Sequence, residues 1–409
     1  MRWTVWLVAG CTVYGCGDSH EGARPDATDQ GADASHDAIA VSDGRSGADG
    51  APEAPRPGPR PVSSTPVAQG SLFAAPDGSG SACAEAAPCD LWEAADQASA
   101  GEVVFLRGGV YPFNSTLDLD TSGTADAPIT FESYPGELAI LDGSALDISD
   151  PAYLGVPGAF IRLRRFEVRY MPWQGVYISG TDNLLEGLHV HHSGLSGIQI
   201  HGGYEPLPYG AAGSRNTIRD CTIHDNSGAG VFDDEFANGG NSDGVSISSG
   251  EANRVEHCLV YANSDDGIDT WRSTNSYVGY SISHSNGIAD GNGTGIKAGG
   301  ASPSSGTTVE RCLSYSNTHV GLDHNSGLLV EFDHNTTWDN ERGYYGGNDT
   351  SISASIAGEG AADFGAGLET MNSWQRPGTL SFVSVDPTSP EFLGPTPGGG
   401  FEDIGAFAP

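Results

Sequence analysis

The stretch "CLVYANSDDGID", residues 258–269, contains the pattern that decides the fold. It holds a cysteine, an asparagine and a glycine at spacings that residues 312–323, "CLSYSNTHVGLD", repeat. The glycine precedes an aliphatic residue or a tyrosine wherever it recurs, at Gly175, Gly197, Gly244, Gly267, Gly295, Gly321 and Gly343. Most of these glycines are 22 to 28 residues apart, which is the period of a solenoid protein.

An asparagine column keeps step with the glycines, and a mixed column precedes it. The asparagines are Asn226, Asn263, Asn286, Asn317 and Asn340. Five residues before them stand Cys221, Cys258, Ser281, Cys312 and Asn335. We interpret the asparagines as an internal amide ladder that satisfies turn backbone groups. We interpret the cysteines as small buried side chains rather than as disulfides or metal ligands.

Each repeat joins short β-branched runs to Gly-, Asn- and Ser-rich turns, without helical periodicity after about residue 101. The sequence therefore predicts an all-β domain over 66–409, a right-handed parallel β-helix. Residues 89–102 predict a short amphipathic helix that caps its N-terminal end, and 101–112 predict the first coil. We interpret the long interval between Gly197 and Gly244 as one coil with two surface insertions, residues 201–213 and 227–242.

The N-terminal residues differ from the repeats in composition. Residues 1–16 combine Arg2 with an apolar run too short to span a bilayer, which predicts an export signal. Cys16, or else Cys11, stands where a bacterial lipobox places its lipidated cysteine; an ordinary signal peptide or a buried strand is the alternative. Residues 17–65 are rich in Ala, Asp, Gly and Pro and predict a disordered tether.

These features predict a monomeric protein that is secreted or held at the cell surface, with a lipid anchor in the outer membrane. In an exported protein the neighbouring cysteines Cys83 and Cys89 suit a disulfide. The net charge of −35 argues against nucleic acid as a partner, because phosphates attract basic surfaces. An acidic substrate would need bridging divalent cations.

Side chains alternate between the inside and the outside along each strand, so the glycine column defines two more columns. The residue after the glycine is almost always aliphatic and must face inward. The next residue therefore faces outward, and this column holds Tyr177, Gln199, Ser246, Asp269, Lys297, Asp323 and Tyr345. Lys297 is the only lysine of the chain, and it stands between Asp269 and Asp323 on neighbouring coils.

Four aspartates converge beside this lysine. Asp243 and Asp266 precede the glycines of successive coils, and Asp265 and Asp269 flank the second of these glycines. Four carboxylates this close repel one another, and a hard divalent cation with oxygen ligands, Ca²⁺, would relieve the repulsion. The alternative is a solvated acidic turn.

This arrangement suits the cleavage of a uronic-acid polymer by β-elimination. A cation that binds the uronate carboxylate acidifies the proton on the neighbouring carbon, and a base can then remove it. Lysine can be that base only when it is neutral. We expect Ca²⁺ to lower the pKa of Lys297. We expect the carboxylates of Asp269 and Asp323 to raise this pKa. In either case we expect an alkaline pH optimum.

The segments "NSDDGID" (263–269), "GNGTGIKAGG" (291–300), "NTHVGLDHN" (317–325) and "DHNTTWDN" (333–340) resemble polysaccharide lyase family nine, the β-helical pectate lyases. The resemblance covers roughly residues 195 to 345. It implies that Lys297 is the Brønsted base and that pectate, or polygalacturonate, is the substrate. It also implies a primary Ca²⁺ held by Asp243, Asp265, Asp266 and Asp269.

Several alternatives stay open. A glycoside hydrolase would need paired carboxylates, and the G-H-G and R-I-K phrases of the β-helical polygalacturonases are absent. The protein could instead be a glycan-binding or adhesive surface lipoprotein, or a lyase for another uronate polymer. Arg272 could bind a uronate carboxylate or be an ordinary surface arginine. We interpret Asp233, Asp234 and Glu235 as an acidic loop, although they could also hold a second cation. We interpret His319 and His324 as surface or ladder residues.

Overall fold

The computed structural model describes residues 57–67, 71–202, 212–229, 239–289, 291–300, 306–358, 361–364, 367–389 and 391–408. The chain divides into two units, Met1–Pro52 and Glu53–Pro409, and every described residue belongs to the second. The predicted signal peptide with Cys11 and Cys16, most of the predicted tether, and the acidic residues 233–235 lie outside the described residues.

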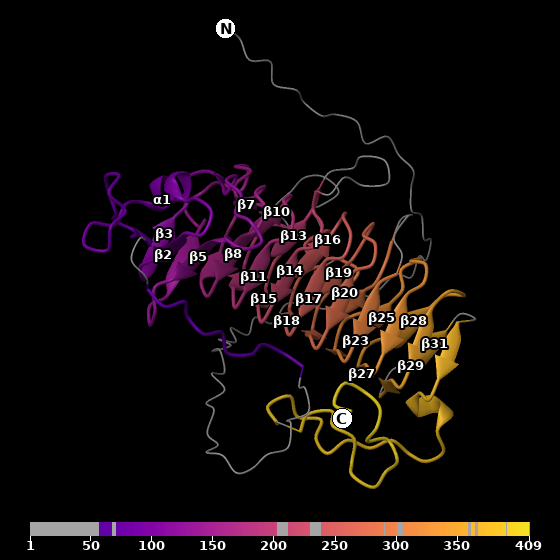
Figure 1. Ribbon diagram of the computed structural model, residues 1–409. Helices are drawn as coiled ribbons and strands as arrows, with labels where there is room; N and C mark the ends of the chain where they lie inside the picture. Colours follow the sequence, from indigo (N-terminus) through magenta and orange to yellow (C-terminus); the bar gives the residue numbers. More distant parts are fainter. Residues whose placement is uncertain are drawn as a thin grey trace, which may run out of the picture. The chain divides into compact units, whose positions relative to one another are not determined.

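The second unit is a right-handed parallel β-helix, as predicted (Figure 1). Within the described ranges its strands form three parallel sheets of twelve, ten and ten strands, and the chain passes from sheet 1 to sheet 2 to sheet 3 in each regular coil. Sheet 1 contains β1 (Leu72–Ala74), β2 (Val103–Leu106), β5 (Ile129–Ser133), β8 (Ile161–Arg164), β11 (Leu184–Glu186), β14 (Thr217–Arg219), β17 (Arg254–Glu256), β20 (Tyr277–Gly279), β23 (Thr308–Glu310), β26 (Glu331–Asp333), β29 (Ser351–Ser353) and β32 (Leu368–Thr370).

The two other sheets follow the same order along the chain. Sheet 2 contains β3 (Gly109–Pro112), β6 (Ala139–Asp142), β9 (Glu167–Arg169), β12 (His189–His191), β15 (Thr222–His224), β18 (Leu259–Tyr261), β21 (Ile282–His284), β24 (Leu313–Tyr315), β27 (Thr336–Trp338) and β30 (Ile356–Ala357). Sheet 3 contains β4 (Leu117–Asp118), β7 (Leu154–Val156), β10 (Val176–Ile178), β13 (Ile198–Ile200), β16 (Val245–Ile247), β19 (Ile268–Asp269), β22 (Ile296–Lys297), β25 (Val320–Asp323), β28 (Arg342–Gly346) and β31 (Ala361–Phe364).

The glycine column and the asparagine column form one packing unit inside the coils. A β carbon on Gly295 would lie 2.6 Å from Asn317 Nδ2 and 2.0 Å from Ser314 Oγ, so only glycine fits there. The same approach to an asparagine amide recurs at 2.7, 2.8, 2.7 and 2.8 Å for Gly197, Gly244, Gly267 and Gly321. The repeat signal in the sequence is therefore a steric requirement of the ladder.

The asparagines form the predicted amide ladder. Asn263 Nδ2 donates to Asn286 Oδ1 at 3.0 Å, and Asn286 Nδ2 donates to Asn317 Oδ1 at 2.9 Å. The oxygens of Asn263, Asn286, Asn317 and Asn340 also accept from the backbone N–H of the asparagine one coil earlier, for example Asn286 Oδ1 from Asn263 N at 3.2 Å. Cys221, Cys258 and Cys312 are free thiols and fully buried, as expected for their column.

A second asparagine ladder, which the sequence interpretation missed, leads into the strands of sheet 1. Asn183 N donates to Asn216 Oδ1 at 3.1 Å, and Asn216 N donates to Asn253 Oδ1 at 2.9 Å. The phrases "DNLLEG", "RNTIRD" and "ANRVEH" carry its signal. The pairing of β13 with β16 confirms that one coil, with β14 and β15 between them, fills the long glycine interval.

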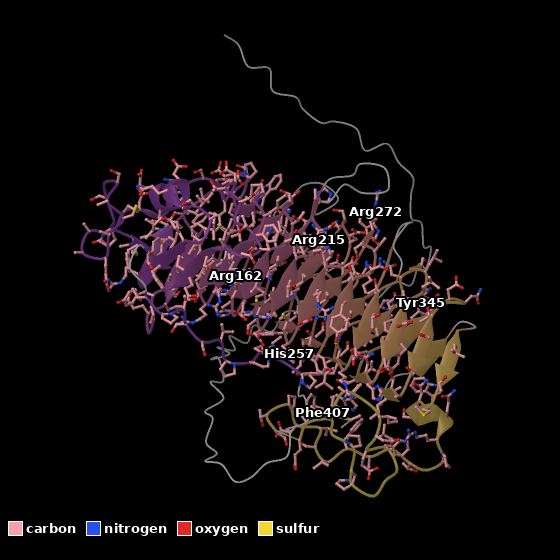
Figure 2. The ribbon with its side chains drawn as sticks, in the orientation of Figure 1. Arg162, Arg215, His257, Arg272, Tyr345 and Phe407 are labelled. Carbon is pink, nitrogen blue, oxygen red and sulfur yellow. A yellow bond between two sulfur atoms is a disulfide. The ribbon has the colours of Figure 1, made fainter. Side chains whose placement is uncertain are left out.

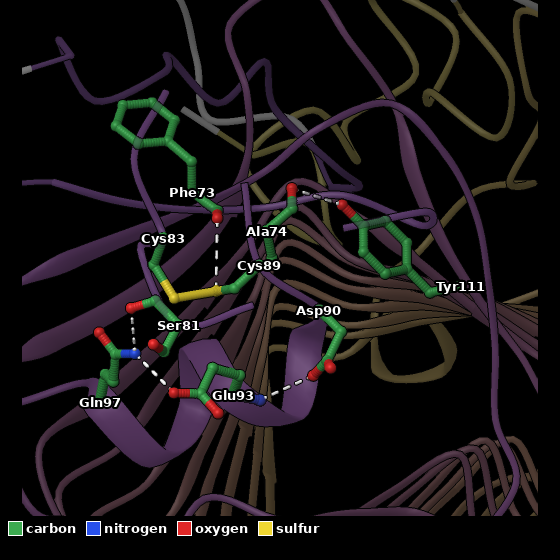
Figure 3. Close-up of a disulfide and its surroundings, with 9 residues drawn as sticks. All are labelled: Phe73, Ala74, Ser81, Cys83, Cys89, Asp90, Glu93, Gln97 and Tyr111. Atoms are coloured by element: carbon green, nitrogen blue, oxygen red, sulfur yellow. Dashed lines mark hydrogen bonds between the residues drawn. A yellow bond between two sulfur atoms is a disulfide. The ribbon is translucent and has the colours of Figure 1, made fainter. Parts of the chain in front are cut away.

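The N-terminal cap is shorter than predicted and follows an additional strand. Helix α1 (Leu91–Gln97) begins after Asp90, whose Oδ1 accepts from Glu93 N at 2.8 Å. The Cys83–Cys89 disulfide lies just before the helix (Figure 3). Residues 101–112 contain β2 and β3, which begin the first coil with all three sheets, as predicted, but β1 adds one earlier strand that pairs in parallel with β2. The three residues of β1 are too few to show a periodicity.

Residues 57–65, which we assigned to the disordered tether, make hydrogen bonds along the β-helix. Arg60 Nε donates to Asp220 Oδ1 at 2.9 Å, and Thr65 N donates to Glu132 Oε1 at 2.7 Å. Glu132 is fully buried, so these bonds and its ion pair with Arg164 offset the cost of burying its charge. The low-complexity composition of this segment gave no sign of these contacts. The other domain boundaries stay predictions. Within the described ranges, no helix has the length and apolar character that a bilayer span requires.

Candidate catalytic and metal site

The strand register of sheet 3 places the outward residues in the predicted column. Asp269 pairs with Ser246 on one side and with Lys297 on the other, and Lys297 pairs with Asp323. Ile268 and Ile296, which precede Asp269 and Lys297, are fully buried. The aliphatic residues therefore anchor the strands and direct Asp269 and Lys297 to the outer face.

Three of the four predicted metal ligands come together. Asp243 lies just before the glycine that leads into β16, Asp266 in the same position before β19, and Asp269 at the end of β19. One carboxylate oxygen from each lies within 4.8 Å of the others. These residues are 4%, 0% and 8% exposed, so the cluster is largely shielded from water.

Asp265 lies beside the cluster but makes different contacts. Its Oδ1 accepts from Asn292 N at 2.5 Å, and its Oδ2 accepts from Asn241 N at 2.7 Å. Asp265 thereby links the Gly-rich loop to the end of the second insertion. These bonds fix the Asp265 side chain beside the cluster, and each carboxylate oxygen keeps a lone pair that could bind a cation.

Lys297 points toward the preceding coil. Its Nζ donates to Asp266 Oδ2 at 2.7 Å and lies 3.8 Å from Asp269 Oδ2. Asp323 was expected to act on this lysine as well, but its Oδ1 instead accepts from Asn325 N at 2.6 Å. Among the described residues, the ion pairs of Lys297 are thus with two members of the carboxylate cluster.

The charges of the site are far from balanced. Burial, the largest influence, lowers the pKa of the Lys297 ammonium, but Asp266 and Asp269 together outweigh it and raise the pKa. Burial raises the pKa of Asp269 to about 8, against the lowering effect of Lys297, and raises that of Asp265 to about 6. Burial and the neighbouring carboxylates also raise the pKa of Asp243. One ammonium does not neutralise these carboxylates.

The cluster fits a hard divalent cation. Asp269 Oδ1 is buried and has no hydrogen-bond partner among the described residues, and the other ligand atoms of the cluster are also carboxylate oxygens. Ca²⁺ prefers oxygen ligands of this kind, and a buried acceptor without a donor is costly unless a cation meets it.

The Gly-rich loop 291–300 approaches the aspartate turn closely. A β carbon on Gly291 would lie 2.5 Å from Asp265 Cα, and one on Gly300 would lie 2.0 Å from Trp271 Cδ1. Trp271 thus packs on the backbone of this loop, a contact that the sequence interpretation missed although the aromatic residue follows the turn. Arg272 lies over the Trp271 ring at 5.3 Å and projects at the upper edge of the β-helix in Figure 2.

The two histidines next to Asp323 lie outside the carboxylate cluster. His319 Nδ1 lies 2.9 Å from Glu341 Oε2. His324 packs against Tyr345, with 5.5 Å between the ring centres, and its Nδ1 lies 3.4 Å from Asp323 Oδ1. These contacts suit the interpretation of both as surface or ladder residues.

Comparisons with known proteins place this geometry in a family. Residues 72–354 match the family model described as "Pel9A-like, right handed beta helix region". Pectate lyase L of Paenibacillus polymyxa is 29% identical over 300 residues, which cover 68% of this chain and 65% of the relative. Pectate lyase PEL9 of Emericella nidulans is 28% identical, and the match covers 77% of this chain and 86% of the relative. The chain therefore spans just under two thirds of the first relative's length and most of the second's.

Solved structures share the fold. The crystal structure of pectate lyase Pel9A aligns with a TM-score of 0.71 at 23% identity, covering 82% of this chain and 91% of that chain. A rhamnogalacturonan lyase aligns with a TM-score of 0.70 at 20% identity, covering 83% and 100%. The family model spans well over half of the sequence. The chain therefore belongs to the Pel9A-like right-handed β-helix family of polysaccharide lyases.

Proposed function

We propose that this protein is a calcium-dependent lyase that cleaves a uronate polymer, pectate in the first place, by β-elimination with Lys297 as the base. One observation carries the proposal: the only lysine of the chain lies half-buried on the outward column, with its Nζ 2.7 Å from a carboxylate of the aspartate cluster. Membership of a polysaccharide lyase family supports the reaction class, and relatives named pectate lyases support the substrate.

In this proposal Asp243, Asp265, Asp266 and Asp269 would hold the Ca²⁺, and backbone hydrogen bonds fix Asp265 beside the other three. When bound, the ion would neutralise the substrate carboxylate and acidify the proton on the adjacent carbon. The oxygen-only ligand set supports the choice of metal, as does Asp269 Oδ1, which has no hydrogen-bond partner within the part of the chain that the structure describes.

The role of base requires a neutral Lys297. Asp266 and Asp269 raise its pKa through their charges, and these same residues belong to the cluster. Once their charges are compensated, burial remains, and burial lowers the pKa of Lys297. Lys297 is therefore charged while it pairs with Asp266. When that pair is weakened, its pKa falls and the neutral amine can accept a proton.

The elimination then needs few groups. Lys297 Nζ accepts the proton from the carbon next to the uronate carboxylate. The electrons of that C–H bond form a carbon–carbon double bond, and the glycosidic C–O bond on the next carbon breaks. The leaving oxygen takes a proton from water, and an unsaturated uronide remains at the new non-reducing end.

The proposal is tested with polygalacturonate, with and without a chelator, by following the ultraviolet absorbance of the unsaturated uronide. We expect product with Ca²⁺, none in excess chelator, and none from Lys297→Ala at unchanged circular dichroism. New reducing ends without the absorbance would indicate hydrolysis instead. Polymer binding without either product would favour a non-catalytic glycan-binding protein.

We also propose that the protein acts outside the cytoplasm, secreted or at the cell surface. The Cys83–Cys89 disulfide supports this, because such bonds persist in oxidising compartments. A lipid anchor at Cys16 or Cys11 would fit the same location. Mass spectrometry of the mature N-terminus, which would carry a lipid on one of these cysteines, tests it.

A further inference from the structure

Four histidines gather on the outer face of sheet 2, whereas Lys297 belongs to sheet 3. His189 and His191 lie on β12, His192 follows them, and His224 lies on β15. The register pairs His189 with Glu167 of β9 and His191 with His224. Three neighbouring coils thus bring four imidazoles and one carboxylate to one patch.

Glu167, His189 and His191 are close enough to share an ion. One carboxylate oxygen and one ring nitrogen from each histidine lie within 4.8 Å of one another. His191 Nε2 lies 3.3 Å from Glu167 Oε1, and His189 Nδ1 lies 3.9 Å from Glu167 Oε2. The His189 side chain is 41% exposed, so an ion could enter from solvent.

Hydrogen bonds fix which nitrogen of His189 carries its proton. His224 Nδ1 lies 2.5 Å from Asp225 Oδ2, and because a carboxylate only accepts, this nitrogen carries the hydrogen. In the tautomer in which His224 Nε2 carries no hydrogen, this nitrogen accepts from His189 Nε2, which lies 2.6 Å away. His189 Nδ1 is left with a lone pair that faces a carboxylate oxygen.

Two acceptors that face each other with no proton between them mark a position for a cation. Arg169 Nη1 contacts Glu167 Oε1 at 3.1 Å, so this cation is engaged on the other oxygen of the carboxylate. Glu167 Oε2 thus remains directed toward the lone pair of His189.

Ring stacking holds the imidazoles in place. The rings of His191 and His224 are 5.0 Å apart at an angle of 4°, and the rings of His224 and Tyr261 are 4.6 Å apart at 8°. His191 Nδ1 also lies 2.7 Å from His192 Nδ1. Ring orientations that are fixed before binding reduce the cost of assembling a metal site.

We propose that Glu167, His189 and His191 bind a divalent first-row transition metal ion of the Zn²⁺ type. Two imidazole nitrogens and one carboxylate oxygen, with a side open to solvent, form a ligand set that such ions favour and that Ca²⁺ does not. The ion joins β9 to β12 across adjacent coils. His224 positions His189, and the site is independent of the proposed lyase chemistry on sheet 3.

Calorimetric titration of the full-length protein with ZnCl₂ in saturating Ca²⁺ tests the proposal. We expect the wild type to bind one Zn²⁺ more than His189→Ala, a substitution that the exposure of His189 should allow to fold. His334→Ala is the matched control: His334 also contacts a carboxylate, Asp333, but follows β26, five coils further along. The histidines at positions 20 and 36 are present in every variant and cancel.

Two further variants separate a ligand from a positioning residue. Glu167→Gln should abolish the same Zn²⁺ equivalent. His224→Phe keeps a ring in the stack but removes the acceptor, so Zn²⁺ should bind about ten- to a hundredfold more weakly. With Co²⁺ as the probe, the wild type should show a visible absorption band that His189→Ala lacks.

Equal Zn²⁺ stoichiometry in the wild type, His189→Ala and Glu167→Gln would overturn the proposal, as would loss of binding in His334→Ala alone. Lys297→Ala should bind Zn²⁺ like the wild type. This result separates a failure of the metal inference from a failure of the proposed lyase function.

Discussion

Lys297 could be replaced by arginine without changing the net charge of the site, and this makes the substitution informative. Arginine would preserve an ion pair with Asp266, but its guanidinium stays protonated and cannot act as a base. We therefore expect Lys297→Arg to lower kcat about a hundred- to ten-thousandfold while Ca²⁺ still binds, measured by product absorbance and by calorimetry. Activity close to the wild type would show that Lys297 serves only to balance charge.

The raised pKa values of the aspartates predict how Ca²⁺ stabilisation depends on pH. Because the pKa is about 8 for Asp269 and about 6 for Asp265, the metal-free folded protein holds protons that the unfolded chain has released. The free energy of unfolding of the metal-free protein is therefore higher at low pH, where both aspartates are protonated, and it falls as pH rises toward 8. Ca²⁺ binds the same carboxylates in their deprotonated form, so its binding offsets this decrease in stability.

We accordingly expect the difference in Tm between Ca²⁺-loaded and chelator-treated protein to grow between pH 6 and pH 8. Groups away from the site contribute alike to both samples and cancel in this difference. The Asp269→Asn variant is the control, since it should show a smaller rise. A difference in Tm that is independent of pH would contradict the prediction.

At the scale of one element, the ladder glycines cannot accept a side chain. A β carbon on Gly321 would lie 2.6 Å from Gly343 O and 2.8 Å from Asn340 Nδ2, whereas one on Gly346 would lie no closer than 3.4 Å to any atom. Gly321→Ala should therefore lower the free energy of unfolding by about 1–3 kcal/mol. Gly346→Ala should change it by less than about 1 kcal/mol, and equal effects in chemical denaturation would contradict the ladder argument.

The elements also show what the sequence could and could not predict. In every coil the outward residue stands two positions after the glycine, and stacked coils align these residues. The register of Asp269, Lys297 and Asp323 therefore followed from the glycines alone. The contacts that each of these side chains makes could not be predicted from the glycines. Asp265 is fixed beside the cluster because backbone N–H groups from a loop and an insertion reach it, and those contacts come from segments without a repeat.

Across the whole molecule, the coils contact mainly their neighbours, so the ends of the β-helix need separate protection. At the N-terminal end, the Cys83–Cys89 bond and α1 close the first coil, and Leu91 and Ala94 are buried there. Near the other end, Phe401 and Ile404 pack against Ala354 and Ile356 of the coil that holds β29 and β30. Apolar contacts therefore cover part of each end of the described β-helix.

Replacing both Cys83 and Cys89 by serine should lower the free energy of unfolding by about 2 kcal/mol, because the disulfide closes a short loop. The cap lies many coils from Lys297, so the activity of the folded variant should stay within about twofold of the wild type. Thermal unfolding and initial rates measure the two effects. A large loss of activity at full structure would show that the cap influences the site.

A chain with one lysine also has one bond that a lysine-specific endoprotease can cut. That bond joins Lys297 to Ala298, and Ala298 is fully buried. Cleavage requires the coil of β22 to open, and it releases only two fragments, one that ends at Lys297 and one that begins at Ala298. The rate at which these two fragments form under native conditions is therefore a direct measure of how often the proposed active site itself unfolds.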